Sequence, residues 1–221
     1  LDENEIDILE TIESRRTELR ADARREFPAW LSKCLSEQWS DADFAKLEER
    51  APVDIRTNST VGSREQLATL LRSRGMELEP TRISSLGLRL PFESRVTEDR
   101  SFEDGWFEVQ DEGSQLAGMI AANACGSPSL VVDYCAGAGG KALQVAASMN
   151  NAGRLVACDI DGERLEQLRL RSRRARAKNV ETVVLSTDGN SLELQGIRNQ
   201  ADLVIADVPC TGSGTWRRAP D

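Results

Sequence analysis

The 221-residue sequence contains no histidine, and this absence excludes several kinds of active site. Hydrolases with a Ser-His-Asp triad or a Cys-His pair use an imidazole as the general base. Most zinc sites need histidine or closely paired cysteines. The 5 cysteines are odd in number and widely spaced, without a Cys-x-x-Cys pair. We therefore expect reduced thiols, no disulfide framework and no bound metal.

Long apolar runs are also lacking. No segment approaches the roughly 18 consecutive apolar residues of a membrane-spanning helix. The N-terminal sequence LDENEIDILE is acidic and lacks the apolar core of a signal peptide. With 39% hydrophobic and 29% charged residues, the composition is typical of a globular cytoplasmic protein without a membrane partner. We favour a monomer, and the length allows one large or two small domains.

Negative charge exceeds positive charge overall, but the positive charge is locally concentrated. The formal net charge of −9 argues weakly against a nucleic-acid partner, because phosphate binding needs a positive surface. Residues 164–178, however, contain seven arginines and lysines and one glutamate, whereas acidic residues gather in the first fifty positions. This separation of charge keeps a basic face possible.

The first half of the chain predicts helices followed by a small α+β region. Ser63 and Gln66 form the pattern of a capping box, and Gly75 would end the helix that it opens. Residues 91–105 are polar and favour a linker, so we place a domain boundary near residue 105. The other expected elements are helices in 2–25, from 28 onward and in 41–50, and strands in 53–59, 77–83 and 86–90.

The second half alternates apolar runs with segments of helix length. Such alternation is typical of βαβ units, whose parallel sheet is buried on both faces. Right-handed connections then give an α/β, Rossmann-like doubly wound fold that binds ligands at the carboxyl ends of its strands. The four expected strands lie in 129–135, 154–160, 180–186 and 201–208, with helices in 109–124, 136–149 and 162–178.

Informative residues follow each of these strands. After the first comes the glycine-rich turn Cys135-Ala-Gly-Ala-Gly-Gly-Lys141, which by itself is weak evidence for a nucleotide-like ligand. After the second comes Asp159, at a position where an acid typically accepts hydrogen bonds from ribose hydroxyls. Asp161 is the alternative for that role, although it also suits the N-cap of the next helix.

The third and fourth strands are followed by Thr187-Asp188-Gly189 and Asp207-Val-Pro-Cys210. An Asp-Gly pair is as often a plain turn as a ligand contact, and a lone cysteine at a strand end is more often inert than reactive. Taken together, the four strand ends indicate a nucleoside ligand. Both NAD and S-adenosyl-L-methionine (SAM) fit, but the turn lacks the third glycine of G-x-G-x-x-G, which favours SAM.

These segments resemble the motifs of a known family. FEVQDEGSQLAG, DYCAGAGGKALQVA, ACDIDGERLEQL, the STDG turn and DVPCTGSGTWRRAPD are similar, in this order, to those of the Fmu/Sun-type RNA cytosine-5 methyltransferases. The resemblance implies a SAM cofactor and an RNA substrate, which in bacterial members of the family is small-subunit ribosomal RNA. It also implies that residues 1–105 form an accessory RNA-binding domain and residues 106–221 the methyltransferase domain.

The resemblance also implies roles for single residues. Asp159 would bind the ribose, Asp188 the adenine end, and Arg164 would support the cofactor site. Asp207 would lie between the cofactor and the target cytosine. The residues that would surround the methionine part of SAM are Cys135, Ala136, Gly137, Ala138, Gly139, Gly140 and Lys141, where the family usually has proline in place of Ala138.

The family's catalytic nucleophile is a cysteine in a Thr-Cys motif, and this sequence contains no Thr-Cys pair. By the resemblance, Cys210 corresponds to a second catalytic cysteine that releases the product. We expect a piece of a longer enzyme rather than an inactive SAM- or RNA-binding module, with an NAD-dependent oxidoreductase as a further alternative. The arginines of 169–178 and Arg217-Arg218 are candidates for phosphate contacts, although the former could equally be a solvated helix face.

Overall fold

The computed structural model describes residues 29–40, 42–43, 46, 49–212 and 217, and the helices expected in 2–25 lie outside these residues. The chain divides into two compact units, residues 52–210 and the remaining terminal segments 1–51 with 211–221. In the terminal unit, helix α2 spans Ala29–Ser36. There Arg217 donates a hydrogen bond of 3.0 Å from Nε to the carbonyl oxygen of Glu49. The candidate site lies in the unit of residues 52–210.

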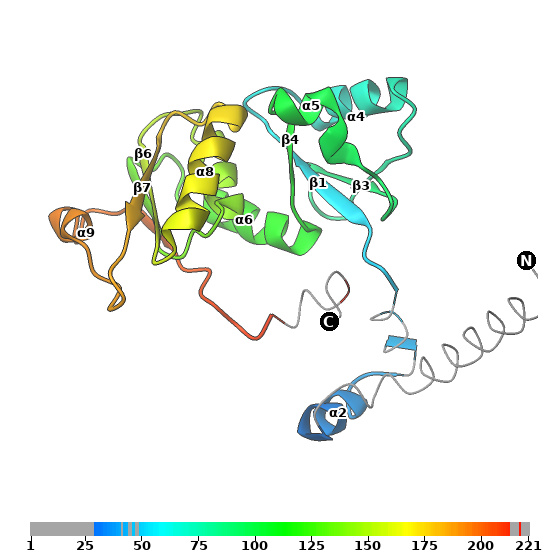
Figure 1. Ribbon diagram of the computed structural model, residues 1–221, viewed down its shortest axis with the longest axis horizontal. Helices are drawn as coiled ribbons and strands as arrows, with labels where there is room; N and C mark the ends of the chain where they lie inside the picture. Colours follow the sequence, from blue (N-terminus) through cyan, green and yellow to red (C-terminus); the bar gives the residue numbers. More distant parts are fainter. Residues whose placement is uncertain (1–28, 41, 44–45, 47–48, 213–216, 218–221) are drawn as a thin grey trace, which may run out of the picture. The chain divides into compact units, whose positions relative to one another are not determined.

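The first sheet of this unit has the order β2-β3-β1-β4 and is antiparallel. Its strands are β1 (Val53–Thr57), β2 (Glu79–Pro80), β3 (Gly87–Leu90) and β4 (Phe107–Val109). Helix α4 (Arg64–Ser73) packs Leu67 and Leu71 into one core with Ile55 and Leu88 (Figure 1). Its N-terminus carries the expected capping box of Ser63 and Gln66.

Residues 91–105 are not the linker that their polarity suggested. They form the 3₁₀ helix η2 (Val96–Glu98) and the short helix α5 (Arg100–Glu103). Val96 is buried in the first core, and the ring of Phe102 lies 5.4 Å from that of Phe107. The linker prediction was wrong because the buried apolar residues of this segment are separated by charged ones, so the segment as a whole has a polar composition. Because β4 pairs with β1, the first sheet continues past residue 105, and the two-domain division stays a prediction.

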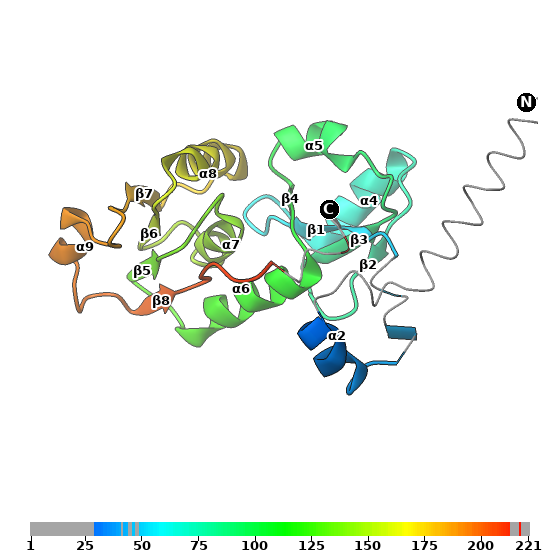
Figure 2. The same cartoon turned by 60° about the horizontal axis from the view of Figure 1, so that its bottom comes forward.

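The second sheet is parallel, as expected, with the order β7-β6-β5-β8 (Figure 2). Its strands are β5 (Leu130–Asp133), β6 (Arg154–Asp159), β7 (Val180–Val184) and β8 (Leu203–Ile205). The accompanying helices are α6 (Glu112–Ala124), α7 (Gly140–Ser148), α8 (Gly162–Ala175) and α9 (Leu192–Gly196).

Alternate residues of β5 enter two different cores. Val131 packs with Leu143 of α7 and Leu168 of α8. Val132 belongs to another core, against which Leu194 of α9 packs. The sheet is therefore covered on both faces, which confirms the doubly wound, Rossmann-like fold. The chain passes from β5 to β6 and β7 on one side and then to β8 on the other, so the switch point lies between β5 and β8.

Two general features concern the described part of the chain. No helix there has the length and apolar character that would be needed to cross a membrane. Nor do these residues bring together three or more cysteine, aspartate or glutamate side chains in an arrangement that could hold a metal ion.

Candidate functional site

The glycine-rich turn connects the end of β5 to the start of α7. Gly137 and Gly139 have φ angles of +53° and +84°, a region that other L-residues rarely adopt. A Cβ atom on Gly139 would lie 2.0 Å from Cδ1 of Leu168, so α8 packs directly against the turn. Glycine is required here both for the backbone angle and for the close approach of the helix.

Asp159, at the end of β6, holds the same turn from the neighbouring strand. Its Oδ2 accepts a hydrogen bond of 2.8 Å from the backbone N–H of Gly137, and its Oδ1 accepts one of 2.9 Å from that of Asp161. The predicted ribose-binding acid thus lies beside the glycine turn, as the parallel strands require. Its role towards a ribose stays a prediction.

A small hollow of about 150 Å³ lies where β5 and β8 end. The first turns of two helices contribute to its lining, because Ser114 belongs to α6 and Gly140 begins α7. The residues that line it are Gln110, Ser114, Asp133, Cys135, Ala136, Gly140, Lys141 and Asp207. Five of the predicted site residues therefore come together with three that the sequence interpretation did not name.

Asp133 is the most unusual of these three. Its side chain is 1% exposed, and its Oδ1 has no hydrogen-bond partner among the described residues. Burial raises the pKa of this carboxyl group to about 7, and the negative charge of Asp207 adds to the effect, which Lys141 opposes. The sequence held a signal for it, because an acid interrupts the otherwise largely apolar run SLVVDYC.

Lys141 and Asp207 form an ion pair at the mouth of the hollow. Nζ of Lys141 lies 2.5 Å from Oδ2 of Asp207, and the Asp207 side chain is 57% exposed. Two carboxyl groups and one ammonium therefore face one small space. Such a set suits a ligand that carries both a positive and a negative charge.

Asp161 and Arg164 are not among the residues that line this hollow. Asp161 is the N-cap of α8, since its Oδ1 accepts from the backbone N–H groups of Glu163 and Arg164. The guanidinium of Arg164 pairs with the same carboxylate at 3.4 Å and is 64% exposed. Asp161 thus has the capping role, and Arg164 reaches the turn only through Asp161 and Asp159.

Asp188 is engaged in its own turn. Its carboxylate accepts hydrogen bonds from the hydroxyl of Ser186 and from the backbone and side-chain nitrogens of Asn190, and these bonds lower its pKa to about 2. The hydroxyl of Tyr134 donates to the carbonyl of Gly189 at 2.7 Å, which ties this turn to the end of β5. The contact of Asp188 with an adenine stays a prediction.

The cysteines differ in environment. Cys135 lines the hollow, and burial together with the charges of Asp159, Asp133 and Asp207 raises the pKa of its thiol. Cys158 is buried, and its pKa is raised to about 12. Both are therefore poor nucleophiles. Cys210 is exposed and follows β8, outside the residues that line the hollow.

Most arginines of α8 form ion pairs or hydrogen bonds within the protein. Arg171 and Arg174 both pair with the buried carboxylate of Glu108, at 2.9 and 2.8 Å. Arg169 pairs with Glu166 and donates to the hydroxyl of Thr182. These residues are not a free phosphate-binding face.

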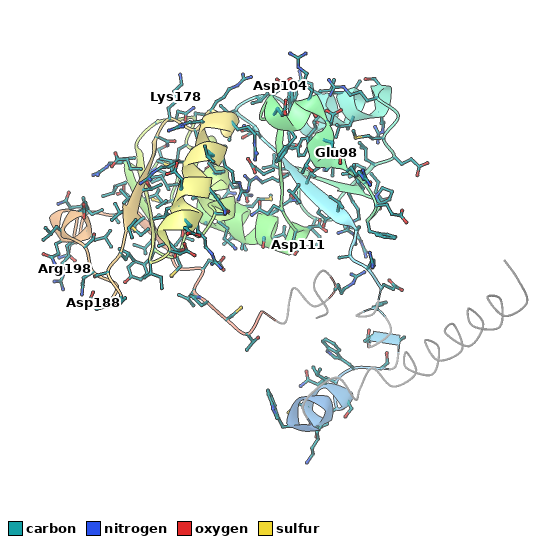
Figure 3. All side chains as sticks on the ribbon, in the orientation of Figure 1. Glu98, Asp104, Asp111, Lys178, Asp188 and Arg198 are labelled. Atoms are coloured by element: carbon teal, nitrogen blue, oxygen red, sulfur yellow. The ribbon has the colours of Figure 1, made fainter. Side chains whose placement is uncertain are left out.

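The exposed basic residues at and just beyond the C-terminal end of α8 are remote from the hollow. Lys178 and Asp188 lie at opposite ends of β7 (Figure 3). Arg173 and Lys178 are exposed near the amino ends of the strands, whereas the hollow is at their carboxyl ends. Any phosphate contact of these two side chains is therefore remote from the site. Arg218 lies outside the described residues.

Two family models match the chain. The model described as 16S rRNA methyltransferase RsmB/F matches residues 124–221. A second, described as the ferredoxin-like domain of RsmF/B-like methyltransferases, matches residues 27–97. The first model includes β5 to β8 with the glycine turn, and the second includes β1 to β3.

Curated relatives and solved structures agree with these matches. The ribosomal RNA small subunit methyltransferase B of Photorhabdus laumondii is 30% identical over 198 residues, which are 88% of this chain and 44% of that protein. That of Shigella flexneri is 32% identical over 223 residues, 97% of this chain and 50% of that protein. The chain thus spans about half the length of these relatives. The structure of a methyltransferase homolog protein from Pyrococcus horikoshii superposes with a TM-score of 0.75 at 25% identity, over 90% of this chain and 65% of that one.

Proposed function

Since the chain belongs to the RsmB/F family of 16S rRNA methyltransferases, we propose that it binds SAM and serves to methylate carbon 5 of cytosine in ribosomal RNA. The observation that carries the cofactor assignment is the hollow at the ends of β5 and β8. It combines a buried carboxyl group with one unpaired oxygen, a second carboxylate and an ammonium beside two helix N-termini.

The charges of this hollow match the amino-acid end of SAM, which carries an ammonium and a carboxylate. Asp133 and Asp207 are the candidate partners of the ammonium. Lys141 and the N–H groups that begin α7 are the candidate partners of the carboxylate. The residues of the turn from Cys135 to Gly140 would surround this part of the cofactor.

The adenosine part of SAM would lie towards the neighbouring strand ends. The position of Asp159 at the end of β6, with its hydrogen bond to Gly137 of the turn, supports this. Asp188 lies in the turn that Tyr134 connects to β5. These two acids are the proposed contacts of the ribose and the adenine.

The bound cofactor supplies an electrophilic methyl group, and carbon 5 of cytosine is by itself a poor nucleophile. A cysteine thiolate that adds to carbon 6 makes carbon 5 electron-rich enough to take the methyl group. Removal of the carbon-5 proton and loss of the thiolate then restore the double bond. The target base must leave its stack to be reached.

In this scheme Asp207 hydrogen-bonds the target cytosine, and the thiol of Cys210 assists release of the product. Both follow β8 and both are exposed, and Asp207 lines the hollow whereas Cys210 is not among its lining residues. The attacking cysteine of the family belongs to a Thr-Cys motif, which this sequence does not contain.

Calorimetric titration of the 221-residue chain with SAM and with NAD⁺ tests the cofactor assignment. We expect SAM to bind and NAD⁺ not to bind. Binding of NAD⁺ without binding of SAM would contradict the proposal and favour an oxidoreductase.

Incubation with methyl-labelled SAM and 16S ribosomal RNA tests the reaction, with 5-methylcytosine identified by mass spectrometry. A full-length relative serves as the positive control. Transfer by this chain that disappears in Cys210→Ala would show that Cys210 is the nucleophile, against the assigned role. SAM binding without any transfer would favour the alternative of a binding module.

A further inference from the structure

A buried arginine of the first sheet reaches the candidate cofactor site from outside it. Arg56, on β1, is 3% exposed. One of its terminal nitrogens donates to the carbonyl of Gly140, the first residue of α7, at 2.6 Å. The same nitrogen donates to the side-chain oxygens of Gln110 and Gln144. Two of these three acceptors belong to residues that line the hollow.

Arg56 determines which way the Gln110 amide points. A guanidinium has only donors, so the atom of Gln110 that faces it must be the carbonyl oxygen. The amide nitrogen Nε2 is then on the opposite side. It lies against α7, because a Cβ atom built on Gly140 would be 3.4 Å from it. Because Gln110 lines the hollow and its oxygen is occupied by Arg56, this N–H₂ group is the donor that it can offer there.

The neighbouring amides hold this arrangement in place. Gln144 donates from Nε2 to the backbone carbonyl of Gln115 at 2.8 Å, and Gln115 donates to the backbone carbonyl of Gln110 at 2.8 Å. Gln115 in turn accepts a hydrogen bond of 2.7 Å from the hydroxyl of Ser84. Gln144 and Gln115 each have one amide orientation that satisfies these partners, and a turned-over Gln110 amide would place its N–H₂ group against the Arg56 donor.

Stability alone does not account for a charge at this place. The acceptors of Arg56 are neutral oxygens, and its burial lowers its pKa to about 10, with the charge of Glu108 acting in the opposite sense. A buried charge is costly, and an apolar side chain of similar size is often as stabilising. What an apolar residue cannot do is orient an amide and a backbone carbonyl together.

We propose that Arg56 is a positioning residue for SAM, which sets the Gln110 amide to donate to the carboxylate of the cofactor's amino-acid part and fixes the first turn of α7 beside it. The inference rests on the proposed function. The donors that line the hollow are the Gln110 amide, the Ser114 hydroxyl and the Lys141 ammonium, and its acids are Asp133 and Asp207, of which Asp207 pairs with Lys141.

A comparison of the affinities for two ligands distinguishes this role from a general contribution to the stability of the fold. S-adenosylhomocysteine carries the amino-acid part, and 5′-methylthioadenosine keeps the adenosine and the sulfur but lacks that part. We expect Arg56→Met to weaken binding of S-adenosylhomocysteine about tenfold, the usual effect of losing a hydrogen bond to a charged group, while binding of 5′-methylthioadenosine changes less than about twofold. Calorimetric titration of the 221-residue chain measures both.

Arg174→Met is the matched control. Arg174 also joins the first sheet to a helix of the second through a buried partner, Glu108, but touches none of the residues that line the hollow. We expect it to leave both affinities unchanged to within about twofold. Gln110→Met, which keeps the length and removes the amide, should reproduce the selective loss and replaces Arg56→Met if that variant does not fold.

Equal weakening of both ligands, or of neither, in Arg56→Met and Gln110→Met would overturn the inference. Failure of the unmodified chain to bind either ligand would instead contradict the proposed function itself, and the inference with it. Selective loss of the amino-acid-bearing ligand supports both.

Discussion

Asp133 ends β5 with a carboxyl group that is buried beside a second acid, Asp207. Because its pKa is raised to about 7 in the fold, the folded protein holds a proton that the unfolded chain releases near its ordinary value of 3.8. The folded state thus binds more protons between these two values, and stability must fall as the pH rises through them. An ammonium in the hollow would relieve this cost.

Asp133→Asn removes the ionisable group with little change in shape. The unmodified chain should lose stability as the pH rises from about 5 to about 8, whereas the variant should not. We therefore expect the unfolding free energy of the variant minus that of the unmodified chain to be about 2 kcal/mol larger at about pH 8 than at about pH 5. Urea denaturation at the two pH values measures the difference. A difference that does not change with pH would show that the carboxyl group is already ionised in the folded protein throughout this range.

Cys210 and Asp207 follow the same strand but differ in their relation to the hollow. Asp207 lines it and pairs with Lys141, whereas Cys210 is exposed and outside it. We therefore expect Asp207→Ala to weaken SAM binding about tenfold and Cys210→Ala to change it by less than about twofold. Calorimetry provides both values, and equal losses would place Cys210 against the cofactor instead of the RNA base.

At the scale of elements, the strand–turn–helix unit from β5 to α7 was predictable from sequence. An apolar run, a glycine cluster and an amphipathic segment each carry a local signal. The helical structure of segment 91–105 was not predictable from sequence, because its few buried residues, such as Val96 and Ser101, are separated by charged ones. Short helices held by tertiary contacts have no periodic pattern of their own.

The two left-handed glycines of the turn give a matched pair of substitutions. Gly137→Ala meets no atom within 4 Å and should cost only the backbone strain of about 1 kcal/mol. Gly139→Ala places its Cβ against Leu168 as well and should cost about 3 kcal/mol. Thermal or urea unfolding distinguishes them. Similar costs for both would mean that α8 can move away from the turn.

At the scale of the whole 52–210 unit, the two sheets are joined by buried polar contacts rather than by one continuous core. Glu108 of β4 is 3% exposed and receives both Arg171 and Arg174 of α8. Asn58 donates to the carbonyls of Gly105 and Ala175, at 2.9 and 2.8 Å. The apolar residues form separate clusters on the two sides of this junction.

Glu108→Ala should therefore destabilise the unit by about 3 kcal/mol, because it leaves two partly buried guanidinium groups without their partner. Glu181→Ala is the control, since its pair with Arg154 is exposed and should contribute less than about 1 kcal/mol. Urea unfolding measures both variants. A small effect at Glu108 would indicate that water replaces the lost carboxylate.

The sequence by itself determined the parallel sheet, the glycine turn and the acids at the strand ends, because alternation, glycine spacing and helix capping are local properties of the chain. Its ordered motifs also indicated the family. Only the tertiary structure brought Arg56 and Gln110 of the first sheet's region to α7, buried Asp133, and turned Arg171 and Arg174 inward. Those contacts join residues far apart in the chain, so they depend on how two sheets pack and on where buried charges find partners. The physical reason is that a charged side chain in a basic segment has the same sequence signature whether it meets solvent, phosphate or a buried carboxylate.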